Sequence, residues 1–198
     1  MNMERISRRF LMITMSVLVI ISLLVHQTRG LNIEGQYLLD IKSKLVDKFN
    51  NLADWNSTDS TPCGWIAVTC NTLDYNDDPV VWSLDLNSMN LSGWLSPSIG
   101  GLVHLTSLDL SSNELSRNIP KKIGNCLSLE VLTLNNNRFE ANIPKELGKL
   151  SCLRILNIYN NRLSGPIPEE IGNLASLSQL VAYSNNISGS LPAISWEP

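Results

Sequence analysis

Histidine, cysteine and aromatic side chains are scarce in this chain. Among 198 residues there are 2 histidines and 4 cysteines, and aromatic residues make up 6%. A single histidine, His104, lies beyond residue 30, so the His and Cys ligands of a usual four-ligand zinc site cannot be assembled. The sequence also has neither a Gly-x-Ser-x-Gly turn nor a Gly-rich phosphate loop. We therefore expect no catalytic residue, no cofactor and no metal, and the chain is not predicted to be an enzyme.

A surplus of basic residues is also absent. The formal net charge is −3, and the first 30 residues carry four arginines against one glutamate, so the remainder is more acidic still. Proteins that bind nucleic acid present a basic surface to its phosphates. The charge balance therefore excludes nucleic acid as an expected partner.

Long apolar runs are missing except near the N-terminus. Three arginines precede an uncharged run from Phe10 to Val25, and the small residues Thr28 and Gly30 follow it. This order is typical of a secretory signal peptide, and the run is shorter than the roughly 20 residues that span a bilayer. We predict a signal peptide at residues 1–30, with a membrane anchor as the alternative. The mature chain is expected to enter the secretory pathway without inserting into a membrane.

What the chain has in abundance is leucine at a fixed period of 24 residues. Two sets of leucines and one set of asparagines keep this period: Leu105, Leu129, Leu153 and Leu177; Leu108, Leu132, Leu156 and Leu180; and Asn113, Asn137, Asn161 and Asn185. An imperfect earlier copy begins at Val81 and has Met89 at the asparagine position. A fixed period of this length is typical of a solenoid. We expect about four and a half repeats over residues 80–192, followed by an irregular tail at 193–198.

Each repeat predicts a short strand followed by a turn. Within Leu-x-x-Leu-x-Leu-x-x-Asn the alternate leucines point inward and the x positions point outward, so successive strands form a parallel sheet. The four asparagines are expected to form a buried row whose amides bond to backbone turns, which is a structural role. Gly93 and Gly165, with Asn118 and Asn142 in the middle copies, indicate a backbone position of positive φ.

Residues 31–79 are expected to cover the open end of the first repeat. Residues 31–52 predict one amphipathic helix, and residues 53–79 predict a loop-rich stretch. Five apolar residues of the helix share one stripe: Tyr37, Leu38, Ile41, Leu45 and Phe49. Cys63 and Cys70 enclose a loop of about eight residues, where a disulfide would contribute roughly 2–3 kcal/mol. A metal site is the alternative for these two cysteines, and the single histidine disfavours it.

Export would also allow N-glycosylation. Asn-x-Ser/Thr sequons stand at Asn56, Asn90 and Asn186, and the last two share one phase of the repeat, so both should face the same exposed side. Cys126 occupies a leucine phase and predicts a buried thiol, whereas Cys152 lies near a turn. A bridge between these two cysteines is geometrically possible, and free thiols are favoured.

The repeat, continued as Leu-Ser-Gly-x-Ile-Pro, resembles the plant-specific class of leucine-rich repeat. The segment from Trp55-Asn56 through Pro62-Cys63-Gly64-Trp65 to Val68-Thr69-Cys70 is similar to the N-terminal cap of that class, with Ala67 where glycine is common. The resemblance covers residues 33–192 and is to the ectodomain of plant leucine-rich repeat receptor-like kinases. Polygalacturonase-inhibiting proteins share the same cap and repeat.

The resemblance implies an α/β fold, namely a right-handed leucine-rich repeat solenoid with a parallel β-sheet on its concave face and an N-terminal helical cap with one disulfide. It implies recognition of an extracellular peptide or protein ligand along that face, with a co-receptor ectodomain as a further partner, at the cell surface or in the apoplast. Such receptors signal in plant defence or development through a cytoplasmic Ser/Thr kinase. The family's transmembrane helix, kinase domain and C-terminal cap do not follow residue 192, so we expect a truncated product.

The outward strand positions form the candidate binding face. Its most prominent feature is Tyr159 above Tyr183 on adjacent strands, because exposed tyrosines combine apolar area with a hydrogen-bonding tip. Glu130, Arg154 and Asn157 are expected to lie beside them. An ordinary polar sheet face on which the two tyrosines only fill space is the alternative.

Three functions remain open from the sequence. The first is a receptor-kinase ectodomain for extracellular recognition, the second a secreted inhibitor or decoy of the polygalacturonase-inhibiting type, and the third a non-functional truncated product. Catalysis is not among them. Asp85 and Asp109 share one phase on adjacent strands, but a glycosidase pair needs a cleft that an open sheet lacks.

Overall fold

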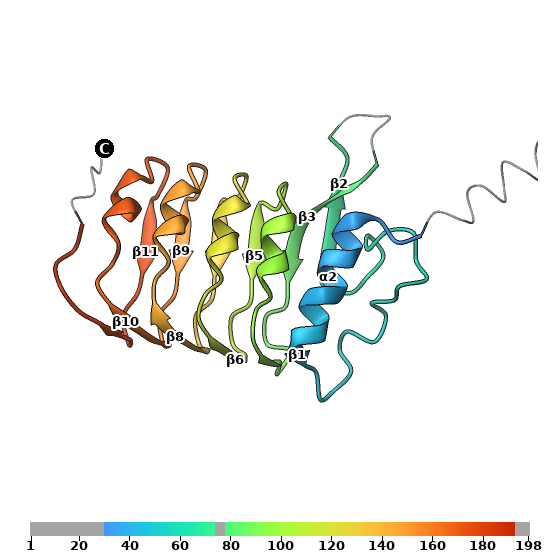
Figure 1. Cartoon of the computed structure of the whole chain (residues 1–198), viewed down its shortest axis with the longest axis horizontal. Coiled ribbons are helices and arrows are strands. Elements are labelled where there is room, and N and C mark those ends of the chain that lie inside the picture. The colour runs from blue at the N-terminus through green and yellow to red at the C-terminus, as the bar shows by residue number, and fades with distance from the viewer. Residues whose placement is uncertain (1–29, 74–77, 193–198) are drawn as a thin grey trace, which may run out of the picture.

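The computed structural model describes residues 30–73 and 78–192. They form an elongated stack of similar turns, with the N-terminal cap at one end (Figure 1). Residues 1–29 of the predicted signal peptide and the predicted tail at 193–198 lie outside the described residues. No helix within the described ranges is long and apolar enough to cross a membrane.

The cap begins with one helix that is shorter than the sequence predicts. Helix α2 spans Ile33–Lys44, and its N-cap residue Asn32 accepts a hydrogen bond from the Gly35 amide. The predicted extension to residue 52 is wrong, because Leu45–Val46 forms strand β1 and pairs antiparallel with strand β4, Ser92–Gly93. Phe49, expected on the buried stripe, is 66% exposed. Leu38 and Ile41 from that stripe are fully buried.

The rest of the cap is held by two tryptophans and a disulfide. The rings of Trp55 and Trp65 stack with their centroids 5.4 Å apart, and the Trp55 indole donates to the Ile66 carbonyl. Cys63 and Cys70 are bridged. Cys70 lies in strand β2, Val68–Asn71, which pairs antiparallel with the first repeat strand, β3, Val80–Asp85. The cap therefore continues the sheet of the repeats and closes its end.

The first sheet has the strand order β2-β3-β5-β7-β9-β11. Beyond β3 its strands are β5 (Ser107–Asp109), β7 (Val131–Thr133), β9 (Ile155–Asn157) and β11 (Gln179–Val181). These strands and β3 are parallel, with each residue paired to the residue 24 positions later. The 24-residue period thus sets the register, and Leu84, Leu108 and Leu132 are fully buried beneath the sheet.

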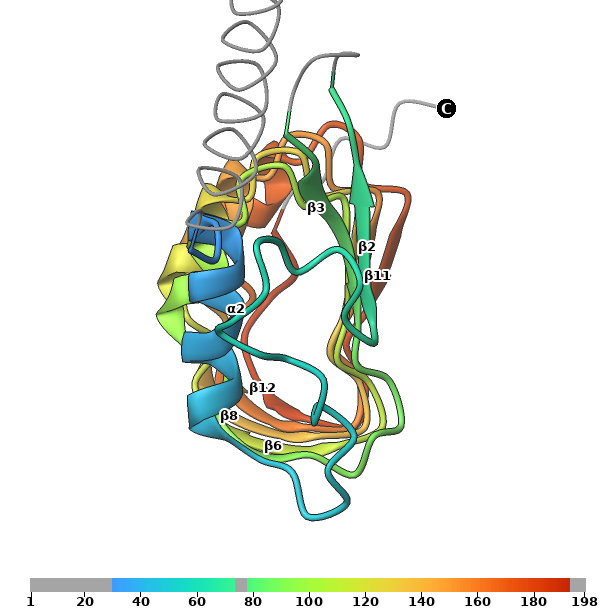
Figure 2. The same ribbon diagram turned by 90° about the vertical axis from the view of Figure 1, so that its right-hand side faces the viewer.

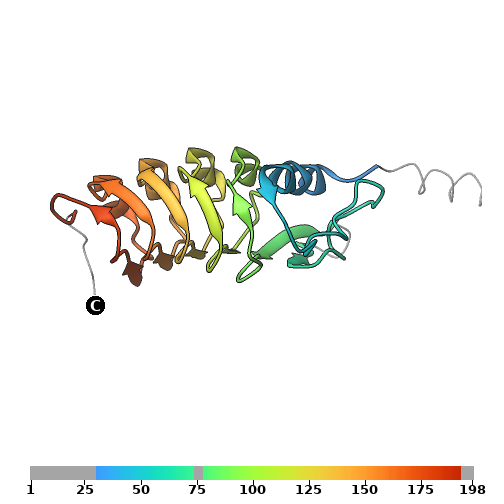
Figure 3. The same ribbon diagram turned by 90° about the horizontal axis from the view of Figure 1, so that it is seen from below.

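A second sheet and a row of short helices complete each turn. The second sheet has the order β1-β4-β6-β8-β10-β12, with β6 at Glu114–Arg117, β8 at Arg138–Asn142, β10 at Arg162–Gly165 and β12 at Asn186–Ile187. The 3-10 helices are η1 (Pro97–Gly101), η2 (Lys121–Asn125), η3 (Lys145–Lys149) and η4 (Glu169–Asn173). The end view shows the two sheets and the helices around one core (Figure 2), and α2 continues the row of short helices (Figure 3).

The positive-φ position of the second sheet is occupied differently from the prediction. It falls on Arg117 (φ 64°) and Ala141 (φ 66°), in phase with Gly93, Gly165 and Gly189. Asn118 and Asn142 stand one residue further along, so the prediction for them is wrong. The backbone turn is fixed by the register of the repeat and is imposed on whichever residue occupies it. At Gly93 only glycine fits, because a Cβ would lie 2.3 Å from the Lys44 carbonyl oxygen.

The four in-phase asparagines connect each turn to the one before it. The Asn113 amide donates to the carbonyl of Leu86 at 2.7 Å, and its oxygen accepts from the Leu91 amide at 2.8 Å. The same two contacts recur at Asn137, Asn161 and Asn185. Asn113 is buried, whereas the other three are half-buried.

Candidate functional site

The outward side chains on the open face of the first sheet form columns along the stack. One of them is Ser83, Ser107, Val131, Ile155 and Gln179, and three others bear on the predicted site. The strand-start column is Trp82, Thr106, Glu130, Arg154 and Ser178; the mid-strand column is Asp85, Asp109, Thr133, Asn157 and Val181; the strand-end column is Asn87, Ser111, Asn135, Tyr159 and Tyr183. The register of the parallel strands aligns the mid-strand column across five strands. Side chains of one column are therefore about 4.8 Å apart from strand to strand.

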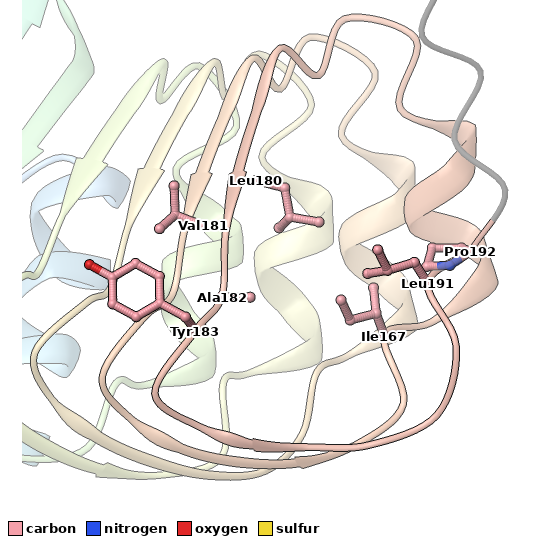
Figure 4. Close-up of a pocket in the computed structure, with 7 residues that line it drawn as sticks. All are labelled: Ile167, Leu180, Val181, Ala182, Tyr183, Leu191 and Pro192. Atoms are coloured by element: carbon pink, nitrogen blue, oxygen red, sulfur yellow. The ribbon is translucent and has the colours of Figure 1, made fainter.

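The two predicted tyrosines form a stacked pair. The rings of Tyr159 and Tyr183 are 4.8 Å apart between centroids and inclined by 11°. Tyr183 is 64% exposed, and the Asn136 amide donates to the Tyr159 hydroxyl at 3.2 Å. Tyr183 and Val181 project from the side of the strand opposite to Leu180 and Ala182 (Figure 4). The two rings therefore present exposed aromatic surface directly after two paired strands.

The predicted charged pair lies away from the tyrosines. Arg154 Nη1 is 3.9 Å from Glu130 Oε2, and both side chains are well exposed, so water screens the contact and it contributes little to stability. These residues precede their strands, whereas the tyrosines follow them, and five residues of strand correspond to about 16 Å. The structure therefore does not place Glu130 and Arg154 beside the tyrosine stack.

Asn157 lies in the centre of the open face. Its register neighbours are Thr133 and Val181. Its carboxamide oxygen is buried and has no hydrogen-bond partner among the described residues. A buried acceptor left without a donor costs free energy in the unliganded protein.

Two aspartates form the other end of the open face. Asp85 and Asp109 are register neighbours on β3 and β5. Each accepts from the backbone amide two residues on, Asp109 from Ser111 at 2.8 Å and Asp85 from Asn87 at 3.1 Å. Neither makes an ion pair within residues 30–73 and 78–192. The sequence pattern places both aspartates among the outward positions of the candidate binding face. As a pair they were considered only for catalysis, and their joint charge on a binding surface was missed although the shared phase was visible.

The three sequons lie outside the open face. Asn56, Asn90 and Asn186 are all exposed. Asn186 begins β12 in the second sheet, and Asn90 precedes β4 of the same sheet. Between them in the same phase, Arg138 and Glu114 form an ion pair at 3.0 Å. Carbohydrate at Asn90 and Asn186 would leave the first sheet uncovered.

The remaining cysteines are free, as predicted. Cys126 is fully buried and Cys152 is exposed. Burial raises the pKa of the Cys126 thiol to about 12, and its sulfur donates to the Ile99 carbonyl at 3.3 Å. Cys126 therefore packs as a small core residue.

No metal centre is present in the part of the chain that the structure describes. That part contains no group of three or more His, Cys, Asp or Glu side chains that could hold a metal. A hollow of about 510 Å³ lies at the last described turn (Figure 4). Its lining residues are Ile167, Leu180, Val181, Ala182, Tyr183, Leu191 and Pro192. Leu180 and Ala182 pack against the repeat core, so core side chains of the last described turn form part of the wall of the hollow.

Comparison with known proteins identifies both parts of the chain. Residues 31–71 match the leucine rich repeat N-terminal domain, and residues 79–193 match the leucine-rich repeat region. A probable leucine-rich repeat receptor-like protein kinase of Arabidopsis thaliana is 65% identical over 83 residues, which are 42% of this chain and 7% of that protein. A second probable kinase of this type from the same species is 53% identical over 93 residues, which are 45% of this chain and 8% of that protein. The chain spans less than a tenth of the length of either kinase.

Solved structures agree with the sequence relatives. The BIR2 ectodomain from Arabidopsis thaliana is 34% identical, with a TM-score of 0.76 over 85% of this chain and 88% of that one. The ectodomain of the receptor kinase GASSHO1/SCHENGEN3 from the same species, solved with CASPARIAN STRIP INTEGRITY FACTOR 2, is 38% identical with a TM-score of 0.72, over 79% of this chain and 19% of that one. The chain therefore belongs to the leucine-rich repeat family, with the cap and repeats found in the ectodomains of plant receptor-like kinases.

Proposed function

We propose that this chain is an extracellular recognition module of the plant receptor-kinase type, which binds a peptide or protein on the open face of the first sheet. The stacked, exposed Tyr159 and Tyr183 carry the proposal. Tyrosines give large contact area at low conformational cost, and the parallel strands hold them rigidly. The GASSHO1/SCHENGEN3 ectodomain was solved in complex with CASPARIAN STRIP INTEGRITY FACTOR 2, and the receptor kinase HAESA with the peptide hormone IDA and the co-receptor SERK1. These complexes support peptide and co-receptor partners for this fold.

Export is part of the same proposal. Residues 1–30 act as a signal peptide, and the exposed Asn56, Asn90 and Asn186 accept glycans in the secretory pathway. Mass spectrometry of the product secreted by plant cells should find an N-terminus at Leu31 and carbohydrate on these three asparagines. An uncleaved product retained in the cell would contradict the extracellular assignment.

The binding role is tested by selecting peptides against the secreted chain and measuring their affinities by calorimetry. Changing both Tyr159 and Tyr183 to Ala should weaken the selected peptides by about tenfold or more, as truncation of aromatic anchors does. Leu127→Ala is the matched control, because Leu127 is 56% exposed and lies between η2 and β7, away from the open face. Equal affinity of the double variant and the parent, with unfolding temperatures unchanged, would refute recognition through the tyrosines.

A further inference from the structure

The open face changes in character along the stack. At its N-terminal end the neighbouring Asp85 and Asp109 carry two like charges with no ion-pair partner among the described residues. At its C-terminal end stand the stacked Tyr159 and Tyr183, with Val181 beside them in the mid-strand column. Thr133 and Asn157 between the two ends are uncharged. The face therefore presents an acidic end and an aromatic end, with neutral side chains between them in the mid-strand column and the Glu130–Arg154 ion pair at the strand starts.

The acidic end selects a cation. Carboxylates on adjacent strands repel one another, and a positive group placed between them removes that repulsion. One carboxylate oxygen of each aspartate accepts a hydrogen bond from a backbone amide. The other oxygen accepts no hydrogen bond from the described residues. A guanidinium or ammonium group fits this pair, whereas phosphates and acidic peptides are disfavoured.

The aromatic end selects an apolar side chain. Because the two tyrosine rings stack, each covers one face of the other, and a ligand meets the ring edges, the hydroxyls and the outer face of the exposed Tyr183. The Tyr183 hydroxyl makes no hydrogen bond to another described residue, so it can bond to a ligand backbone. An aromatic or branched aliphatic side chain packs against the ring edges and Val181.

We propose that this face binds an extended peptide with a basic side chain and an aromatic or aliphatic side chain four positions apart. Three strand spacings, about 14 Å, and two residues along the strand, about 7 Å, separate the centres of the two pairs, so the centres lie about 16 Å apart, a span of between four and five residues of extended chain. Side chains of an extended peptide alternate between its two sides, so positions i and i+4 point the same way. This inference rests on the proposed function and names the ligand class of the same face.

The test uses four synthetic nonapeptides with the secreted full chain and isothermal titration calorimetry. The first places Arg and Phe four positions apart in a Gly/Ser background; the second places them three apart; the third replaces Arg with Glu; the fourth replaces Phe with Ser. The first should bind at least about tenfold more tightly than each of the others, a difference of about 1.4 kcal/mol. Its affinity should fall as salt rises.

Variants of the protein test which end of the open face binds the basic side chain and which binds the apolar one. Asp85→Asn with Asp109→Asn keeps an oxygen acceptor for each backbone amide, and it should abolish the preference for Arg over Glu while the preference for Phe over Ser remains. Tyr183→Ala should abolish the preference for Phe over Ser while the preference for Arg over Glu remains. Glu140→Gln is the charge-matched control, since Glu140 is an exposed carboxylate on β8 of the second sheet, and it should leave all four affinities unchanged.

Two results overturn the inference in different ways. If the four peptides bind equally, or if selected peptides depend on Tyr159 and Tyr183 but lack the basic residue at this spacing, recognition stands and the spacing rule fails. If no peptide responds to any open-face variant, both the spacing rule and the proposed function fail.

Discussion

At the scale of single residues, the repeat imposes a backbone conformation that two of its residues suit poorly. Arg117 and Ala141 have positive φ at the position that glycine fills in three other turns. A residue with a Cβ in the left-handed region costs about 1 kcal/mol or more. Arg117 has a compensating contact, because its guanidinium lies 3.7 Å from the centroid of the Trp94 ring. Ala141 has no such contact.

Ala141→Gly should therefore raise the free energy of unfolding by roughly 0.5–1 kcal/mol, because glycine adopts positive φ without a steric cost. Urea denaturation of the purified protein measures the change. Ala175→Gly is the control, since Ala175 is exposed in a turn and is not among the positive-φ residues; it should lower stability slightly. A loss of stability in Ala141→Gly equal to that of the control would contradict strain at this position.

At the scale of elements, the docking of α2 on the repeats depends on two carboxylates whose pKa values move in opposite directions. Burial raises the pKa of Glu34, whose side chain accepts a hydrogen bond from the Val81 amide at 2.6 Å. Hydrogen bonds from the Ser96 and Ser98 hydroxyls lower the pKa of Asp40. The ionised form of Glu34 therefore opposes folding, and the ionised form of Asp40 favours it.

Glu34→Gln should stabilise the protein increasingly as the pH rises from 4.5, the ordinary pKa of this group, through its raised folded value. The stability that Glu34 contributes is present at low pH, where it is protonated, and is lost over that window. Glutamine cannot ionise, and it keeps an oxygen for the Val81 amide. Guanidinium denaturation across this range measures the difference between variant and parent.

Asp40→Asn provides the opposite case on the same helix. Its loss of stability should be largest near neutral pH and should vanish as the pH falls through the lowered pKa of the parent's Asp40. A pH-independent difference for both variants would show that the two carboxylates act by packing alone.

At the scale of the whole molecule, stability should fall along the stack toward its last described strand. Leu156 on β9 and Ile158 directly after it are at most 1% exposed, whereas the corresponding Leu180 and Ala182 are only partly buried. In a stack of repeats each turn is stabilised mainly by its neighbours. Hydrogen exchange followed by mass spectrometry should therefore show β11 exchanging before β9, and β5 last. Uniform protection of β5, β9 and β11 would indicate that the stack unfolds as one unit.

Features that depend on a local pattern could be predicted from the sequence, and features that depend on contacts between distant segments could not. The 24-residue period was enough to predict the stacked strands and their buried leucines, because alternation along a short strand is a local property. The end of α2 was not predictable locally, since Leu45 leaves the helix to pair with Gly93. The tyrosine pair was predictable from phase alone. The separation of Arg154 from Tyr159 was missed because the two residues are only five positions apart in the sequence. In an extended strand five positions already place two side chains far apart.

The asparagine row also has a consequence for how this chain lengthens or shortens in evolution. Asn113 bonds to Leu86 and Leu91, so each asparagine fastens the turn that precedes it. A duplicated block of 24 residues carries its own asparagine, so the added turn is bonded to the turn before it. An insertion that shifts the asparagine out of phase with the preceding turn loses that bond. Met89 is tolerated because no repeat precedes it; there, Asn51 of the cap donates to the Met89 carbonyl. Gain or loss of whole 24-residue turns is therefore the change in length that best preserves the hydrogen bonds between turns.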